Sequence, residues 1–227
     1  MIKDAALVAV YGPRGSGKST LVRALIDPRQ NVIAFDPIAD YAQMRGWEAV
    51  QMTGHAGEDR KRLSAAAKRA LKRKKFRMAA VPFDGQEDVC LHNLALWMFD
   101  LQRGYREGRL REKLTLVIEE MDLSFPVSKL PKEMFAMAKL CNQGRHWGLE
   151  AIAVTQFPQQ ISKTFRNNAT VTYAFKLPDT PRRAVEENMA DADKPALRGL
   201  KKYEFVQLSI DGMKRGKTLA SGKVQLS

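Results

Sequence analysis

The segment YGPRGSGKST, residues 11–20, places two glycines, a lysine and a hydroxyl at the spacing G-x-x-x-x-G-K-[ST], which is typical of a loop that binds phosphate groups. Glycines let the backbone turn its amides toward a phosphate, and a helix that follows adds its dipole. Lys18 should reach the β and γ phosphates of a nucleotide, and the Ser19 hydroxyl should ligate Mg²⁺. The expected nucleotide-binding residues are Gly12, Pro13, Arg14, Gly15, Ser16, Gly17, Lys18, Ser19 and Thr20.

Two adjacent carboxylates could supply the rest of a hydrolytic site. The apolar run LTLVIEE ends in Glu119 and Glu120. Hydrolysis needs an acid that holds Mg²⁺ through water, on a strand beside the loop, and a general base that polarises the attacking water. We assign Glu119 to the metal and Glu120 to the water. The alternative is two solvated acids in a loop, because an apolar run that ends in charge is a common pattern.

Two further polar residues are candidates for the same reaction. Gln156 ends the run AIAVTQ, where its amide could contact the γ phosphate or orient the water; a polar start to the helix before Pro158 explains it equally well. Arg145, in the segment GRHWG, is placed to reach the phosphates of a neighbouring subunit. A surface salt bridge is the alternative for Arg145, and Arg166 competes for the same role.

Apolar runs and helical periodicity predict the elements that must position these residues. Strands are expected at residues 5–11, 31–35, 76–83, 113–122, 149–156 and 169–177. Helices are expected at residues 19–26, 60–77, 91–105, 131–144 and 158–168. Alternating strands and helices predict an α/β fold, with a mostly parallel sheet flanked by helices on both faces. Sites in such sheets lie at the carboxyl ends of the strands.

The last fifty residues predict a smaller appendage. A helix is expected after the turn LPDTP, followed by strands at 203–210 and 217–224 with a turn at 211–216 between them. No repeat or long linker divides the chain. We therefore expect one domain over residues 1–227, with a core at 5–177 and a helix and β-hairpin extension at 178–227.

The composition describes a globular, strongly basic protein. Hydrophobic residues make up 44% of the 227 residues, and 38 Lys and Arg outnumber 25 Asp and Glu, for a net charge of +13. Such a surface attracts polyanions, of which nucleic acid is the commonest, although a basic surface without a partner and an anionic membrane are alternatives. Cys90, Cys141 and the three scattered histidines predict no metal site made wholly of protein ligands. No apolar run approaches the length of a membrane span.

The positive charge is concentrated between residues 60 and 77, where ten of 18 residues are Lys or Arg and none is acidic. We predict an amphipathic helix whose outer face contacts DNA, with a merely solvated face as the alternative. The candidate nucleic-acid contacts in this segment are Arg69, Lys72, Arg73 and Lys75. A second basic cluster, near a loop, contains Arg103, Arg106, Arg109 and Arg111. We expect this cluster to line the DNA channel, with Arg106 and Arg109 as further nucleic-acid contacts.

Five segments in order resemble the FtsK-HerA superfamily of P-loop DNA translocases. They are GPRGSGKST, VIAFDPIADY, LVIEEMD, QGRHWGLEAIAVTQFPQQI and FRNNATVTYAF. The resemblance covers roughly residues 5–177 and is greatest to the compact DNA-packaging ATPases of tectivirus-type viruses, which are tailless, contain a membrane and carry double-stranded DNA. Two features depart from the pattern: Glu119 stands where that family usually has Asp, and no signature of a DNA-gripping pore loop is present.

The resemblance implies a P-loop NTPase fold of the RecA/ASCE type and an ATPase that uses Mg²⁺. It further implies a homo-oligomeric ring, expected to be a hexamer, that pumps double-stranded DNA into a preformed viral procapsid at its portal vertex. Gln156 would be the sensor and Arg145 an arginine that acts in trans. Such a protein is expected in the host cytoplasm and in the virion at the packaging vertex.

Three other readings remain open. Filamentous-phage assembly ATPases resembling zonula occludens toxin share the Arg-His and Thr-Gln features, but they carry a membrane span. A P-loop kinase acting on a nucleotide or small molecule needs no paired acids after a strand. A nucleotide-gated binding module without turnover would not need Glu120 as a base.

Overall fold

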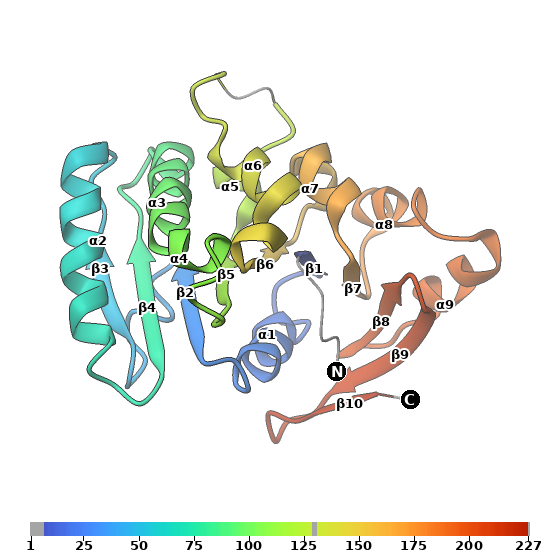
Figure 1. Ribbon diagram of the computed structural model, residues 1–227. Coiled ribbons are helices and arrows are strands. Elements are labelled where there is room, and N and C mark those ends of the chain that lie inside the picture. The colour runs from blue at the N-terminus through green and yellow to red at the C-terminus, as the bar shows by residue number, and fades with distance from the viewer. Residues whose placement is uncertain (1–6, 129–130, 227) are drawn as a thin grey trace.

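The computed structural model describes residues 7–128 and 131–226. Within them a ten-stranded sheet has the strand order β10-β9-β8-β7-β1-β6-β5-β2-β4-β3 (Figure 1). The strands are β1 (Leu7–Tyr11), β2 (Asn31–Phe35), β3 (Glu48–Gln51), β4 (Phe76–Val81), β5 (Leu114–Ile118), β6 (Leu149–Thr155), β7 (Val171–Phe175), β8 (Glu204–Ser209), β9 (Gly212–Thr218) and β10 (Val224–Leu226).

The strands from β7 to β3 are parallel to one another, and β8, β9 and β10 continue the sheet in antiparallel fashion. The parallel part therefore has one carboxyl edge, where β1, β5 and β6 all end, and one amino edge, where they all begin. The C-terminal extension joins this same sheet through the pairing of β8 with β7. The α/β class and the antiparallel C-terminal hairpin are thus as predicted.

Helices cover the two faces of the sheet unequally (Figure 1). The α-helices are α1 (Lys18–Ile26), α2 (Ala56–Ala70), α3 (Glu87–Leu101), α4 (Arg103–Arg106), α5 (Met121–Ser124), α6 (Ala136–Gln143), α7 (Lys163–Asn168), α8 (Asp179–Glu186) and α9 (Lys194–Arg198). Short 3₁₀ helices are η1 (Gly144–Trp147), η2 (Pro158–Gln160) and η3 (Asp191–Asp193). The packing of α2, α3, α6 and α7 builds one core, and α1 packs in the core on the other face.

The unbroken apolar run of β1 follows from this arrangement. Leu7 and Ala9 lie in one core and Val8 and Val10 in the other, so every position of the strand is buried, as in other parallel strands covered on both faces. The strand fixes the start of the phosphate-loop segment in the middle of the sheet.

The structure corrects several predicted boundaries. The strand expected at 113–122 ends at Ile118, before α5, and the strand expected at 217–224 is interrupted between the end of β9 at Thr218 and the start of β10 at Val224. The helix expected at 60–77 is α2, which ends at Ala70; the chain then turns, and Phe76 already belongs to β4. The hairpin turn expected at 211–216 lies earlier, because Gly212 takes the left-handed conformation (φ 103°) beside Ile210 and Asp211 and starts β9. The edge strand β3 was not predicted, since it has four residues of which only Val50 is buried.

Candidate nucleotide site

The loop between β1 and α1 has the backbone that its glycines make possible. Gly17 adopts φ 105°, where a side chain would be strained and a Cβ would overlap Thr218 of β9. At Gly12 a Cβ would lie 2.6 Å from the Ser16 hydroxyl and 2.9 Å from Phe175. The Ser16 Oγ is buried and has no hydrogen-bond partner among the described residues, which fits a loop whose interior is satisfied by a bound polar group.

Lys18 lies inside this loop. Its Nζ donates to the carbonyl oxygens of Gly12, at 2.7 Å, and Pro13, at 3.1 Å. Burial lowers the pKa of Lys18, while the negative charges of Glu120 and Glu119 oppose that shift. The ammonium group is therefore held between the loop and the paired carboxylates, where it can bind phosphate oxygens. Ser19, the next residue of α1, is exposed at the loop.

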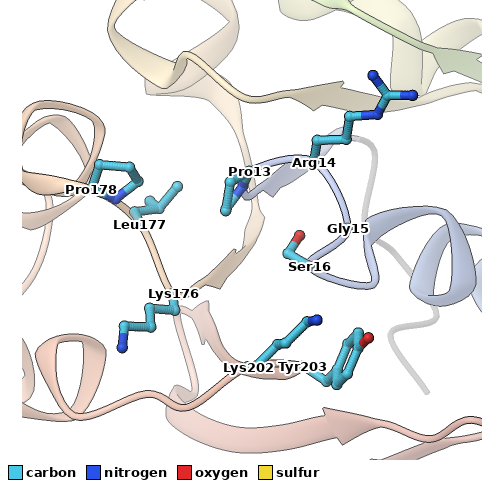
Figure 2. Close-up of a pocket in the computed structure, with 9 residues that line it drawn as sticks. All are labelled: Pro13, Arg14, Gly15, Ser16, Lys176, Leu177, Pro178, Lys202 and Tyr203. Atoms are coloured by element: carbon cyan, nitrogen blue, oxygen red, sulfur yellow. The ribbon is translucent and has the colours of Figure 1, made fainter.

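A cavity of about 390 Å³ adjoins the loop on the side of β7 (Figure 2). Its walls come from three segments: the loop itself, the residues after β7, and the residues before β8. The lining residues are Pro13, Arg14, Gly15, Ser16, Lys176, Leu177, Pro178, Lys202 and Tyr203. The contribution of Lys202 and Tyr203 was not predicted, because nothing in their local sequence resembles a nucleotide motif.

The two glutamates follow β5, and β6 separates that strand from β1. We predicted that the acids follow a strand adjacent to β1, and this prediction is wrong: they follow β5, which lies one strand further away. The intervening strand β6 ends at Thr155, so Gln156 follows it at the carboxyl edge, between the loop and the acids.

Glu119 is buried and tightly held. Its Oε1 accepts a hydrogen bond of 3.1 Å from the Tyr41 hydroxyl. Burial raises the pKa of Glu119 to about 7, and the charges of Glu120 and Asp36 act in the same direction, whereas the Tyr41 hydrogen bond and Lys18 oppose it. A cation placed beside this carboxylate would favour its ionised form.

Tyr41 and Asp36 are site residues that the sequence reasoning missed. The buried carboxylate of Asp36 accepts hydrogen bonds from the backbone N–H groups of Asp40, at 3.0 Å, and Ala42, at 2.9 Å. These bonds fix the turn that carries Tyr41 to Glu119. The available signal was the acid and proline at the end of the second strand, in VIAFDPIADY, which indicate a turn but not its partner.

Glu120 and Gln156 connect the acids to the loop. The backbone N–H of Arg14 donates to Gln156 Oε1 at 3.1 Å, and Gln156 Nε2 donates to Glu120 Oε1 at 3.4 Å. Glu120 has φ 45° and ψ 53°, a left-handed conformation that is uncommon for a residue other than glycine and is concentrated at functional sites. One amide side chain thus contacts both the phosphate loop and the predicted general base.

Thr155 has a different role from its neighbour. Its hydroxyl donates to a carboxylate oxygen of Asp122, at the start of α5, and accepts from the backbone N–H of Phe157 at 2.9 Å. The side chain is fully buried. Thr155 therefore braces the segments that carry Glu120 and Gln156, and Asp122 is a supporting residue that was not predicted.

Arg145 lies at the opposite edge of the sheet from the loop of its own chain, whereas Arg166 lines the same cavity as Tyr11, the last residue of β1. Arg145 is in η1, directly before β6, and Arg166 is in α7, which precedes β7. Because β6 has seven residues, the two edges are about 20 Å apart at the rise of an extended strand. The Arg145 side chain is exposed, whereas the Nε of Arg166 is buried and has no hydrogen-bond partner within residues 7–128 and 131–226.

The second basic cluster adjoins Arg145. The guanidinium of Arg106, in α4, lies 4.5 Å from the ring centroid of Trp147, which is in the same turn as Arg145. Arg109 pairs with Glu107. This cluster is therefore part of the surface around Arg145 at the amino edge.

The basic segment is partly neutralised by acids from other elements. Arg69 and Arg73 both pair with Glu48 of β3, and Lys75 pairs with Asp27 after α1. The prediction of an uncompensated positive charge in this segment is therefore wrong for Arg69, Arg73 and Lys75. Their partners lie at least 21 residues away in sequence, outside any local window.

Four lysines of the same segment remain available. Lys61, Lys68, Lys72 and Lys74 are exposed, and within residues 7–128 and 131–226 none of them forms an ion pair. Of the four contacts predicted for nucleic acid in this segment, Lys72 is the one without an acidic partner. It lies just after the end of α2.

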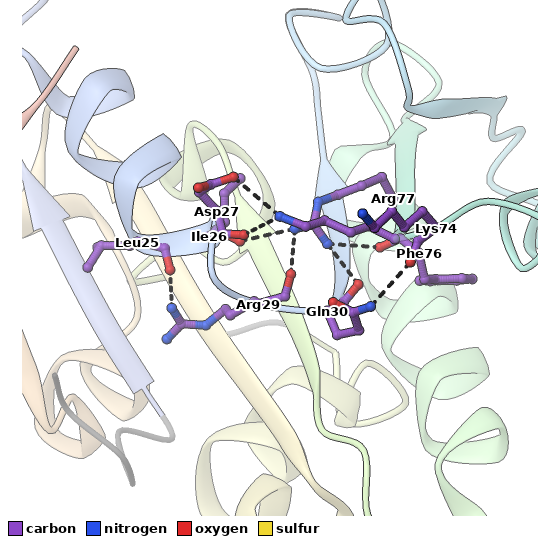
Figure 3. Close-up of polar contacts among 9 residues, drawn as sticks. Leu25, Ile26, Asp27, Arg29, Gln30, Lys74, Phe76 and Arg77 are labelled. Carbon is purple, nitrogen blue, oxygen red and sulfur yellow. Dashed lines mark hydrogen bonds and ion pairs between the residues drawn. The ribbon is translucent and has the colours of Figure 1, made fainter. Parts of the chain in front are cut away.

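Arg77, the last cation of the segment, is structural (Figure 3). It belongs to β4 and is buried. Its guanidinium donates to the carbonyl oxygens of Ile26, Arg29, Gln30 and Phe76 at 2.5–3.1 Å. These bonds tie the end of α1 and the turn that follows it to the start of β4.

Comparisons with known proteins bear on the fold. A scan against protein-family models and a search of the curated proteins gave no match. Among solved structures, the chain is similar to the genome packaging NTPase B204 from Sulfolobus turreted icosahedral virus 2 in complex with AMPPCP, with a TM-score of 0.66, 16% identity and coverage of 98% of this chain and 96% of that one. VirB4 of Thermoanaerobacter pseudethanolicus aligns with a TM-score of 0.61, 12% identity and coverage of 91% and 87%.

The DNA-packaging ATPase B204 from Sulfolobus turreted icosahedral virus is also similar, with a TM-score of 0.64, 15% identity and coverage of 100% and 98%. At these identities the likeness concerns the fold. No helix of the described residues is long and apolar enough to cross a membrane. The chain has the α/β fold of these P-loop ATPases, as the resemblance to the FtsK-HerA superfamily implied.

Proposed function

We propose that this protein is an ATP-hydrolysing motor of the FtsK-HerA type that translocates double-stranded DNA and packages a viral genome into a preformed procapsid. The observation that carries the hydrolytic part is the pair of hydrogen bonds from Arg14 to Gln156 and from Gln156 to Glu120. They join a phosphate loop to a carboxylate able to act as a base. The packaging part is supported by the likeness to B204, named a genome packaging NTPase, and by the net charge of +13.

Three side chains divide the work at the carboxyl edge. Lys18 binds the β and γ phosphates with its ammonium group. Glu120 accepts a proton from the attacking water as general base. Gln156 is the sensor, because a shift of the loop on phosphate binding would move its amide and with it the carboxylate of Glu120.

The donor set fits Mg²⁺. The Ser19 hydroxyl and the Glu119 carboxylate offer oxygen, which this ion prefers, and Mg²⁺ bound with nucleotide phosphates keeps several waters. The described residues contain no cluster of three or more His, Cys, Asp or Glu side chains around a metal, and none is needed for such an ion. When bound, Mg²⁺ neutralises charge on the phosphates. Tyr41 holds Glu119 in place.

The arginine needed at the transition state would come from another subunit. Arg145 is exposed at the amino edge and cannot reach the loop of its own chain across the sheet. We therefore propose a homo-oligomeric ring, a hexamer, in which Arg145 contacts the γ phosphate bound by a neighbour. Arg166 is the alternative, and its buried Nε makes it less accessible to a partner.

The exposed lysines of the segment 60–77, with Arg69, Arg73 and Lys75, would contact the DNA backbone, and Arg106 and Arg109 would line the DNA channel. The whole chain of 227 residues would be one motor domain. It would act in the host cytoplasm and at the packaging vertex of the virion, where portal proteins are the expected partners.

ATP turnover with and without duplex DNA tests this function. A translocase should hydrolyse ATP slowly alone and several-fold faster with long duplex. A kinase would instead phosphorylate a nucleoside or small-molecule acceptor without DNA, and a binding module would bind ATP without turnover.

A further inference from the structure

The strand order indicates how a bound nucleotide would be oriented along the carboxyl edge of the sheet. On one side of β1 lie β6 and β5, which carry Gln156 and the two glutamates; on the other side lie β7 and β8. The γ phosphate must approach Glu120 to be hydrolysed. The nucleoside at the other end of the triphosphate therefore points toward β7 and β8, which is where the cavity of about 390 Å³ adjoins the loop (Figure 2).

Tyr203 presents an aromatic surface to this cavity. Tyr203 is 41% exposed and lines the cavity beside the loop. Its backbone has φ 69°. This left-handed conformation is rare for a bulky residue and persists only where neighbouring residues hold it in place. The ammonium of Lys202 lies 5.0 Å from the ring centroid, which adds positive charge beside an aromatic platform.

The conformation of Tyr203 is fixed by β9. The backbone N–H of Thr218 donates to the Tyr203 carbonyl oxygen at 3.0 Å, and the Thr218 hydroxyl donates to the same oxygen at 3.4 Å. Thr218 is buried, and it packs against the loop at Gly17. The same threonine thus positions the aromatic residue and contacts the phosphate loop.

The opposite wall combines an apolar surface with one cation, Lys176. Leu177 and Pro178 follow β7 and face Lys202 and Tyr203 across the cavity, with the loop residues between them (Figure 2). Among the lining residues, all of which the structure describes, none has a carboxylate or carboxamide side chain. A flat heterocycle would be held by its faces, because aromatic stacking needs no particular pattern of donors and acceptors.

We propose that this cavity binds the nucleoside of the bound nucleotide, with a purine base stacked on Tyr203 opposite Leu177 and Pro178. The C-terminal extension is then a working part of the nucleotide site, supplying the base platform through Tyr203 and the contact to the loop through Thr218. This inference rests on the proposed nucleotide function, and it adds the segment that recognises the base.

The test compares two ligands that share phosphates but differ in the base. Binding of ATP and of inorganic tripolyphosphate is measured by calorimetry, both with Mg²⁺, on the full chain and its variants. Tyr203→Phe keeps the ring. Tyr203→Asn removes it and, because asparagine tolerates the left-handed conformation, preserves the fold; Phe83→Asn removes a similarly exposed aromatic residue elsewhere as a control.

We expect Tyr203→Asn to weaken ATP binding about tenfold or more, with Tyr203→Phe and Phe83→Asn within about twofold of the original. Tripolyphosphate affinity should be the same in all four proteins. The inference is overturned if Tyr203→Asn leaves ATP affinity unchanged, if it weakens tripolyphosphate equally, or if the original chain binds both ligands equally well. Failure of the original chain to bind either ligand would instead overturn the proposed nucleotide function.

Discussion

At the carboxyl edge of the parallel sheet, hydrogen bonds join the phosphate loop to Gln156 and Gln156 to Glu120, and Glu119 beside them is bonded to Tyr41. At the amino edge, by contrast, arginines from separate elements face outward. The first edge holds Lys18 and the two glutamates that we assign to hydrolysis. The second holds Arg145 in η1 and Arg106 in α4, with no phosphate loop nearby. Under the proposed function each edge carries half of an NTPase site, and a complete site would combine the carboxyl edge of one copy with the amino edge of another.

The largest effect is expected from removing the cation of the carboxyl edge. Lys18→Ala should lower ATP turnover by more than about 10³-fold, because it removes both phosphate binding and transition-state stabilisation. Turnover and ATP binding are measured together, with Lys214→Ala as an exposed lysine control. Normal hydrolysis by Lys18→Ala would eliminate the site described here.

The amino edge is tested by Arg145→Ala, which should reduce turnover about 10³-fold while leaving ATP binding to the isolated chain unchanged. Arg145→Lys should recover little, because an ammonium lacks the planar fork of the guanidinium. Arg111→Ala removes another exposed arginine from the same part of the chain as a control. If Arg166→Ala reproduces the loss and Arg145→Ala does not, the trans-acting arginine is Arg166.

Within the carboxyl edge, Glu120→Gln should stop most hydrolysis, by about 10²-fold, with nucleotide affinity kept. Glu119→Gln should instead weaken the dependence of ATP binding on Mg²⁺. Binding and turnover of both variants are compared at several Mg²⁺ concentrations. The opposite pattern would reverse the two assignments.

A smaller effect is expected on DNA binding, when the unpaired lysines of the segment 60–77 are compared with the cations that pair with acids. Changing Lys61, Lys68, Lys72 and Lys74 to Gln should reduce the slope of log affinity for duplex DNA against log salt by about one for each phosphate that the protein no longer binds. Changing Arg69, Arg73 and Lys75, which already pair with acids, should reduce it less. Equal slopes in all three proteins would leave this segment as a solvated surface.

The smallest difference is expected between the affinities for ATP and GTP, which differ only in the base. Because the cavity beside the loop offers apolar walls and an aromatic ring, ATP and GTP should bind within about tenfold of each other. Competition of GTP against ATP measures this. A preference of several hundredfold would require a group that reads the base edge, and the stacking platform would not explain it.

The sequence was most informative where function depends on neighbouring residues. The loop from Gly12 to Thr20, the apolar strand β1 and the position of Glu119 and Glu120 after β5 follow from local spacing and periodicity. The class of the fold followed from the alternation of strands and helices. These features need no knowledge of how distant segments meet.

Features that depend on tertiary contacts were out of reach. Tyr41 contacts Glu119 across 78 residues of sequence, and Thr218 reaches the loop at Gly17 from the far end of the chain. The order of strands, which inserts β6 between the loop and the acids, is equally invisible in a local window. The pairing of Glu48 with Arg69 also joins segments that are distant in sequence, so no local pattern predicts it.

Mixing two inactive variants tests most directly whether one site is shared between two copies. Arg145→Ala subunits keep an intact carboxyl edge, and Glu120→Gln subunits keep an intact amino edge. We predict that each protein alone is nearly inactive, and that their mixture regains ATP turnover where a Glu120→Gln subunit donates Arg145 to an Arg145→Ala neighbour. A mixture of assembled subunits that stays as inactive as its components would contradict the shared site.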